Sequence, residues 1–249
     1  MNLILLDQSE ITANNRVLLQ DRRSAHILKV LKCGIGDTVR IGLFNGPQGH
    51  GRISACDNNQ VELVVFLDAD DSAPPLTDLI LALPRPIMLQ RILSQAAAMG
   101  VRKIFITNAN RVEKSFFQAS LLQNERYRTF ILQGLEQAMA TFIPEVSIHK
   151  RFRPFVQEYL PTIINDYQTR LIAHPNATAT IIEHVHPPLQ HRVIIAIGPE
   201  GGWVDFEIAR FQDLGFKSFS LGNRILRVDT AVPAILAQID LLRSMPTPE

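Results

Sequence analysis

The sequence predicts an α/β protein in two parts: a small N-terminal β-barrel and a larger C-terminal α/β domain with a mostly parallel sheet. Short alternating segments with tight turns fill residues 37–67, whereas strand-like and helix-like segments alternate from residue 79 onward. The acidic, proline-containing stretch at residues 68–75 (DADDSAPP) separates the two patterns and is typical of a linker. We therefore expect one domain at residues 1–72 and a second at residues 73–249.

The N-terminal barrel is predicted from three strands, at residues 37–43, 51–55 and 61–67. The first two alternate apolar and polar side chains, and the third is rich in valine and leucine. Asn45 and Gly46 supply a turn between the first two strands.

The C-terminal domain is predicted from alternating elements. Its expected strands are residues 79–83, 101–107, 146–149, 170–173, 193–197 and 216–221. Its expected helices are residues 87–99, 121–140 and 206–214, with Gly100 and Gly215 ending the first and third. A final helix carries an i, i+3, i+4, i+7 stripe of Val232, Ile235, Leu236, Ile239 and Leu242.

Composition excludes several classes of protein. The 249 residues are 46% hydrophobic and 20% charged, so the chain can bury a core and is not mainly disordered. A net charge of +1 argues against nucleic-acid binding by overall charge, although a local basic patch could still bind RNA. No apolar run approaches the ~20 residues of a membrane-spanning helix, and two cysteines form no disulfide framework. We expect a cytoplasmic protein without membrane contact.

Residues 197–203 (IGPEGGW) form the first candidate ligand loop. The loop follows the buried strand at residues 193–197, and ligands of open α/β sheets bind at such carboxyl ends. A plain turn needs one glycine. Three glycines around Pro199 instead favour a loop whose backbone approaches a ligand closely.

Residues 221–231 (LGNRILRVDTA) form the second candidate ligand loop. Asp229 or Thr230 could cap the last helix, with Pro233 in its first turn. Capping leaves Arg227 unexplained, because an arginine beside a helix N-terminus and a glycine-rich loop suits a phosphate or base.

Together with residues 26–37 (HILKVLKCGIGD), these segments resemble the ribosomal RNA small-subunit uridine N3-methyltransferase family. That family belongs to the SPOUT class of S-adenosylmethionine (AdoMet) enzymes. The resemblance implies a PUA-like RNA-binding barrel, an α/β domain with a trefoil knot, and a homodimer. It also implies methylation of N3 of a uridine in 16S ribosomal RNA of the small subunit.

The resemblance places AdoMet in three loops, and we expect no metal ion. The implied cofactor-binding residues are Ala173, His174, Ile197, Gly198, Pro199, Gly201, Gly202, Leu221, Gly222, Asn223, Ile225 and Leu226. The neighbouring histidines at 184, 186 and 191 lack a matched metal-ligand spacing, so we interpret them as loop residues.

Candidate catalytic residues follow from the chemistry of uridine, whose N3 carries a proton at neutral pH. Arg227 could stabilise the anion or hold a phosphate, Asp229 is a candidate base or orienting group, and Glu200 is a rival for either role. Arginines and lysines at residues 22–32 could contact RNA phosphates, although a solvated helix face is the alternative. The candidate RNA-binding residues are Arg22, Arg23, His26, Lys29, Lys32, Arg85 and Arg224.

Three departures from the family keep alternative functions open. The family's K-G-(D/E)-(K/R)-M-E stretch is here residues 84–90 (PRPIMLQ), which retains only the positive charge of Arg85. Glu136 and Gln137 lack the arginine that usually follows them, and Asp229 stands where glutamate is common. The alternatives are methylation at another RNA position, or a catalytically silent RNA-binding or ribosome-assembly factor.

Overall fold

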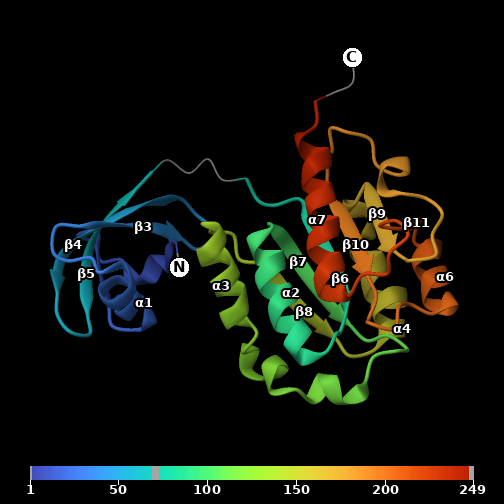
Figure 1. Cartoon of the computed structure of the whole chain (residues 1–249), viewed down its shortest axis with the longest axis horizontal. Helices are drawn as coiled ribbons and strands as arrows, with labels where there is room; N and C mark the ends of the chain where they lie inside the picture. Colours follow the sequence, from blue (N-terminus) through green and yellow to red (C-terminus); the bar gives the residue numbers. More distant parts are fainter. Residues whose placement is uncertain (1, 69–72, 247–249) are drawn as a thin grey trace. The chain divides into compact units, whose positions relative to one another are not determined.

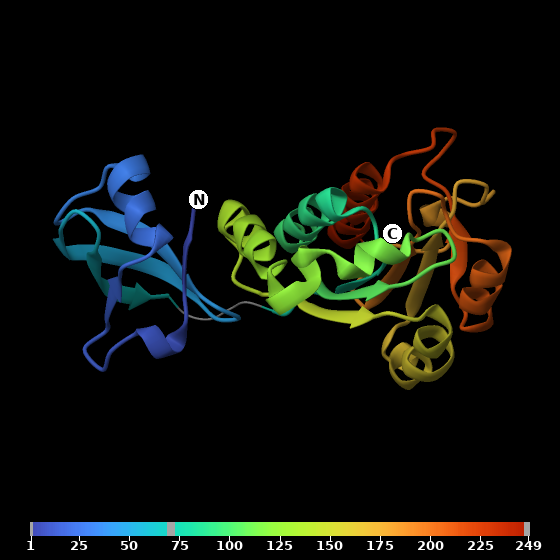
Figure 2. The same ribbon diagram turned by 90° about the horizontal axis from the view of Figure 1, so that it is seen from below.

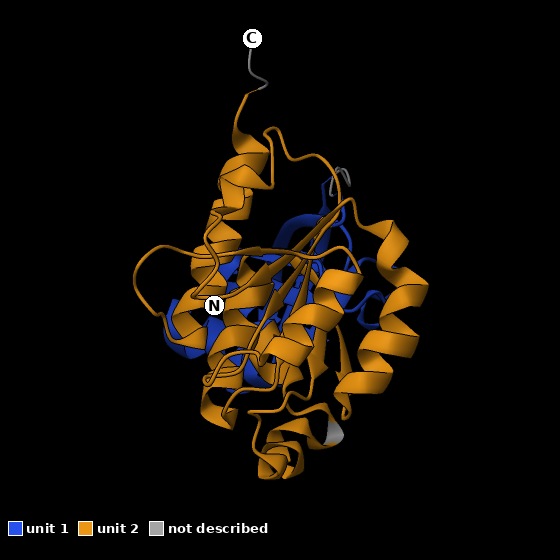
Figure 3. Ribbon diagram, turned by 90° about the vertical axis from the view of Figure 1, so that its right-hand side faces the viewer, with its two compact units in different colours: residues 1–74, 132–143 blue, residues 75–131, 144–249 orange. Residues whose placement is uncertain are grey.

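The computed structural model describes residues 2–68 and 73–246 (Figure 1). The chain forms two compact units: Met1–Pro74 with Leu132–Ile143, and Pro75–Ile131 with Pro144–Glu249 (Figure 3). The first break falls inside the predicted linker, of which residues 69–72 lie outside the described residues. The inclusion of Leu132–Ile143 in the first unit differs from the expected division at residues 72 and 73.

The first unit contains a five-stranded mixed sheet in the order β1-β3-β4-β5-β2, curled into a half-barrel. Its strands are β1 (Ile4–Leu6), β2 (Arg16–Leu19), β3 (Thr38–Leu43), β4 (Gln48–Cys56) and β5 (Val61–Leu67). β1 pairs in parallel with β3, and the other pairs are antiparallel. Alternate side chains such as Val39, Ile41 and Leu63 form its buried core. The three predicted strands are confirmed, and β1 and β2 are additional.

The segment from the middle of the chain is hydrogen-bonded into this unit. The carbonyl of Glu136 accepts from the backbone N–H of Asn2 at 3.0 Å, and the Thr141 carbonyl accepts from Asn45 at 2.9 Å. The Thr141 hydroxyl also donates to the Gly46 carbonyl at 2.8 Å. These contacts complete the unit from residues that lie far away in the sequence.

The second unit contains a six-stranded sheet in the order β11-β9-β10-β6-β7-β8, in which every pairing is parallel. Its strands are β6 (Thr77–Ala82), β7 (Val101–Thr107), β8 (Glu145–His149), β9 (Thr169–Ala173), β10 (Val193–Ile197) and β11 (Lys217–Phe219). The central strands β6 and β10 are buried along their whole length, as expected for a sheet covered on both faces. The predicted α/β class is confirmed.

Helices cover both faces of this sheet (Figure 2). Its helices are α2 (Pro86–Ala98), α4 (Phe152–Pro154), α5 (Leu160–Ile163), α6 (Asp205–Asp213) and α7 (Val228–Ser244). The helix α3 (Arg128–Ala138) begins in this unit, and its larger part belongs to the first. α2 and α7 pack together on one face, and the segment from α4 to α5 lies on the other. Among the described helices, none combines the length and apolar character that crossing a membrane requires.

Two predicted helices begin elsewhere than expected. The helix predicted at residues 121–140 is divided, because Glu125 has a φ of 53° and regular helix resumes only at Arg128. The last helix begins at Val228, so Arg227 occupies its N-cap position and Pro233 lies beyond its first turn. The prediction that Asp229 or Thr230 caps this helix is therefore wrong.

Candidate functional site

An open pocket lies where β9, β10 and β11 end. Since these strands are parallel, the loops that follow them meet at one edge of the sheet. The pocket encloses about 680 Å³ when the open space at its mouth is included. Every predicted cofactor-binding residue lines it except Gly201 and Asn223. The lining residues not predicted for any role are Pro175, Trp203, Phe219, Ser220, Val228 and Ala231.

Backbone hydrogen bonds fix two of these loops to each other. The N–H of His174 donates to the Phe219 carbonyl at 2.9 Å, and the N–H of Ser220 donates to the Ala179 carbonyl at 2.9 Å. His184 adds a third contact, with Nε2 lying 2.9 Å from the Ser218 carbonyl oxygen. The loops after β9 and β11 therefore form one connected wall.

The glycine-rich loop after β10 packs against the buried side chain of Trp203. Trp203 is 3% exposed, and a Cβ added at Gly198 would lie 3.1 Å from its backbone nitrogen. Gly202 has a φ of +74°, which favours glycine, and its N–H donates to the Pro199 carbonyl at 2.8 Å. Gly201 does not line the pocket, and its carbonyl accepts a hydrogen bond from Arg111.

Glu207 joins the same loop to the segment that follows β7. Its buried carboxylate accepts from the N–H of Val204 at 3.0 Å and from the N–H of Asn110 at 2.6 Å. Such bonds to a charged acceptor are stronger than neutral ones. Glu207 therefore ties the C-terminal end of the glycine-rich loop to the segment that follows β7.

A second, charged pocket adjoins the first. It brings the three predicted catalytic residues Arg227, Asp229 and Glu200 together with Arg85, which was predicted to contact RNA. Glu200 and Val228 line both pockets. Met88 completes the lining, and its Sδ lies 3.3 Å from Nη2 of Arg227.

Asp229 lies between two arginines. Its Oδ1 is 3.5 Å from Nε of Arg227, and its Oδ2 is 3.5 Å from Nη1 of Arg91 on α2. The Asp229 side chain is only 13% exposed, and Oδ1 is buried without a hydrogen-bond partner among the described residues. In the first turn of α7, its carboxylate also lies where a helix favours negative charge. Oδ2 thus accepts a hydrogen bond from Arg91, whereas Oδ1 has no hydrogen-bond partner among the described residues.

Glu200, unlike Asp229, contacts a backbone group rather than an arginine side chain. Its Oε1 accepts from the backbone N–H of Arg85, the residue before α2, at 3.0 Å. The bond joins the glycine-rich loop to the beginning of α2 and suits an orienting role. Met88 and Arg91 were not predicted, because they reach the site through the packing of α2 on α7.

The predicted RNA-binding residues fall into two groups. Arg85 and Arg224 are exposed and line the charged and open pockets of the second unit, respectively. The other five lie on α1 (Arg22–His26) and the helical turn Ile27–Leu31 that continues it, or directly after that turn, in the first unit. Lys29 and Lys32 are exposed and His26 is half-buried.

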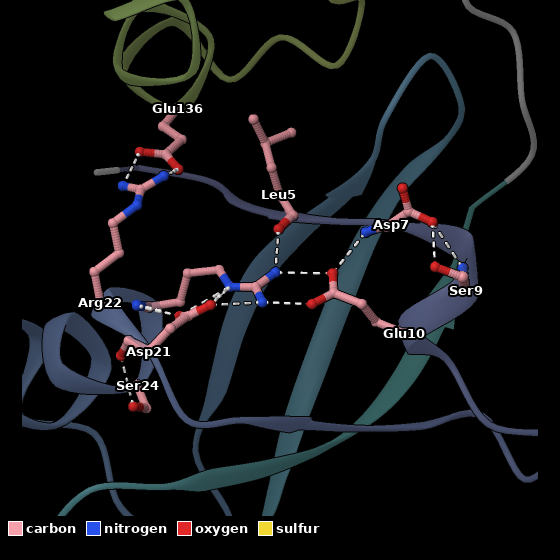
Figure 4. A network of polar contacts seen from close by, with 9 residues as sticks. Leu5, Asp7, Ser9, Glu10, Asp21, Arg22, Ser24 and Glu136 are labelled. Carbon is pink, nitrogen blue, oxygen red and sulfur yellow. Dashed lines mark hydrogen bonds and ion pairs between the residues drawn. The ribbon is translucent and has the colours of Figure 1, made fainter. Parts of the chain in front are cut away.

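The two arginines of α1 are held by internal contacts, and Figure 4 shows that of Arg22 with Glu136. Arg22 donates to the carboxylate of Glu136 at 2.9 Å. The Arg23 side chain is 13% exposed and donates to Glu10 at 2.9 Å and to the Leu5 carbonyl at 2.8 Å. The hydrogen bond from Arg23 lowers the pKa of Glu10 below its ordinary value. The geometry gives Arg23 a structural role that the sequence did not indicate.

Within the described ranges, no cluster of three or more histidine, cysteine, aspartate or glutamate side chains could hold a metal ion. The site consists of glycine loops, apolar walls and the charged pocket beside them.

Comparisons with known proteins identify the family. The RNA methyltransferase domain family matches residues 72–240. Ribosomal RNA small subunit methyltransferase E of Treponema pallidum (strain Nichols) is 32% identical over 242 residues, covering 96% of this chain and 90% of that protein. The enzyme of the same name from Neisseria gonorrhoeae, solved bound to S-adenosyl methionine, shares the fold, with a TM-score of 0.78 at 22% identity and coverage of 97% and 98%. The chain belongs to the ribosomal RNA small subunit methyltransferase E family.

Proposed function

We propose that this chain transfers a methyl group from AdoMet to N3 of a uridine in 16S ribosomal RNA of the small subunit. One observation carries the proposal: the open pocket shares Glu200 and Val228 with a charged pocket that contains Arg227 and Asp229. A methyl donor in the first pocket would therefore lie beside groups suited to activating a base. The names of the relatives support ribosomal RNA as the substrate.

The open pocket fits AdoMet by the chemistry of its walls. Apolar side chains of Ile197, Leu221, Ile225 and Leu226 suit the faces of an adenine, and backbone groups of the glycine loops suit its polar edge. When bound, AdoMet supplies the electrophilic methyl group. The chain's task is orientation and control of charge.

The charged pocket supplies groups for the uridine. In this proposal Asp229 accepts the N3 proton, and the guanidinium of Arg227, 67% exposed, stabilises the negative charge that spreads over O2 and O4. Glu200 orients the beginning of α2 through the N–H of Arg85. The target nucleotide must leave any base stack to reach this pocket.

We further propose the assembled small subunit as partner, a homodimer as the active form and the cytoplasm as location. Lys29 and Lys32 are the exposed cations available to RNA phosphates on the first unit's helical turn.

Ile225 is 84% exposed at the pocket mouth, and a second copy of the chain would bury it. Sedimentation equilibrium tests the proposed homodimer, because a monomeric mass at micromolar concentration would contradict it.

The testing experiment uses labelled AdoMet and small ribosomal subunits from a strain that lacks this protein. We expect label in the subunit RNA with the wild-type chain and at least a hundredfold slower transfer with Asp229→Asn, a loss of about the size given by removing a general base. Arg227→Ala should be similarly impaired. Intact AdoMet binding without label in any RNA would instead favour a silent RNA-binding factor.

A further inference from the structure

We propose that a groove beside β8 binds a single-stranded stretch of the substrate RNA next to the target nucleotide. This β8 groove encloses about 800 Å³, including its open side. It is lined by His149, Lys150, Arg151, Pro154, Phe155, Glu158, Tyr159 and Thr162. The inference rests on the proposed function, and it assigns an additional contact surface outside the two pockets described above.

Aromatic rings form one wall of the groove. The His149 ring centroid lies 4.5 Å from that of Phe155 and 4.6 Å from that of Tyr159, with Phe105 behind them. Tyr159 is 37% exposed, so part of its ring is available to a ligand. Burial lowers the pKa of His149, which keeps its ring uncharged near neutral pH. Proteins bind unpaired bases by stacking them on such rings.

Two cations also line the groove. Lys150 and Arg151 are exposed, and neither forms an ion pair with a carboxylate of the described residues. Arg153, two residues after Arg151, does not line the groove, and its guanidinium lies 5.1 Å from the centroid of the Phe206 ring. Glu158 is the acidic residue in the lining, so positive charge prevails. Cations beside stacking rings fit the alternating phosphates and bases of single-stranded RNA.

The groove is joined to the cofactor loop through short contacts. Asn108, which follows β7, donates from its backbone to the His149 carbonyl at 3.1 Å and from its side chain to the Lys150 carbonyl at 3.2 Å. Three residues further on, Arg111 donates to the carbonyl of Gly201. Phe152 also packs against Trp203, with ring centroids 6.1 Å apart.

The groove therefore lies at the carboxyl ends of the strands, as the two pockets do. β7 and β8 are parallel to each other and to β10, so the groove and the methyl-transfer pockets lie at the same carboxyl ends. An RNA strand whose target base enters the charged pocket, at the beginning of α2 and α7, would cross this edge of the sheet to reach the groove beside α4 and α5. An acidic peptide would also meet Lys150 and Arg151, but it would leave the aromatic wall unused.

The test compares two double variants of the full chain. Lys150→Ala/Arg151→Ala removes two charges from the groove. The matched control Arg192→Ala/Lys217→Ala removes two charges from the opposite edge, because these residues lie before or at the start of β10 and β11. Tyr159→Leu tests stacking separately. The probes are an eight-residue oligouridylate and small ribosomal subunits.

We expect the groove variant to bind oligouridylate about tenfold more weakly. The slope of log affinity against log salt should fall by about 1.4, at ~0.7 for each single-strand phosphate contact. The KM for subunits should rise by a similar factor while kcat and AdoMet affinity stay unchanged. Tyr159→Leu should weaken binding about fivefold or more without altering the salt slope.

Wild-type affinity and slope in the groove variant, or an equal loss in the control, would overturn the inference. So would displacement of the oligouridylate from the groove by a polyglutamate peptide at equal concentration. If wild-type protein methylates subunits and the groove variant has the same KM, only the groove inference fails. If wild-type protein methylates no RNA, the proposed function fails, and the oligouridylate measurement still decides whether the groove binds RNA.

Discussion

Arg91 and Asp229 connect α2 to α7, with Nη1 of Arg91 lying 3.5 Å from Oδ2 of Asp229. The Arg91 side chain is 60% exposed, whereas that of Asp229 is 13% exposed. The exposed arginine thus holds a nearly buried carboxylate that also faces Arg227. We conclude that Arg91 positions the acidic group of the charged pocket.

Arg91→Ala is expected to lower kcat about 10- to 100-fold, because a small displacement of a reacting group has effects of that order. AdoMet affinity should change less than twofold, since Arg91 does not line the cofactor pocket. Arg91→Lys keeps the charge and should restore most of the activity. Steady-state methyl transfer gives both parameters, and an unchanged kcat in Arg91→Ala would refute the positioning role.

Gly222→Ala should weaken AdoMet binding about tenfold. Gly222 has a φ of +104°, and an L-residue with positive φ costs about 1–2 kcal/mol, which the loop can relieve only by moving. The fluorescence of Trp203, the chain's single tryptophan, reports binding because it lines the pocket. Gly34→Ala is the control, as no atom lies within 4 Å of its added Cβ. Equal affinity in both variants would contradict the assignment of this loop.

Arg102→Ala is expected to lower the free energy of unfolding by about 3–5 kcal/mol. Arg102 donates to Asp78 at 2.9 Å, and Asp78 is completely buried on β6, where it also accepts from the Tyr167 hydroxyl. Removal of the arginine leaves a buried charge without its cation. Urea unfolding measures the effect. The control is Lys103→Ala, which removes an ion pair between the half-buried Lys103 and the exposed Glu145 and should cost less than about 1 kcal/mol. Similar losses in both variants would contradict this account.

Acid should destabilise the first unit through Glu10. The hydrogen bond from Arg23 lowers the folded-state pKa of Glu10 below the ordinary 4.5, so the unfolded chain binds the proton more readily. The stabilisation that the ionised Glu10 gives the folded state is therefore complete above pH 4.5, and it is lost as pH falls through the folded-state pKa of Glu10. Hydrogen exchange of the first unit between pH 6 and pH 3 should show this loss of stability. In Glu10→Gln the stability of the first unit should depend less steeply on pH. An equally steep loss in Glu10→Gln would rule out this carboxylate as the cause.

The sequence predicts best where a signal is local. The strands ending at Ile197 and Ala173 and the glycine loop after Ile197 are found where expected, because burial and glycine spacing are properties of short segments. β1 was missed because it has three residues and pairs with β3 in parallel, which needs no hairpin turn.

What the sequence could not predict depends on contacts between distant segments. Arg23 faces inward because Glu10 and Leu5 are brought to it by the half-barrel. Arg91 joins the site because α2 packs on α7. The trefoil knot, which the family resemblance implies, stays a prediction.

The central claim is tested most directly by identifying the nucleoside that carries the transferred methyl group. Small subunits from the strain lacking this protein are incubated with labelled AdoMet and the wild-type chain, and their RNA is digested and resolved by mass spectrometry. We expect the label in 3-methyluridine, at one position, and its absence with Asp229→Asn. Label in a 2′-O-methylated nucleoside or in another base would contradict the assignment of uridine N3.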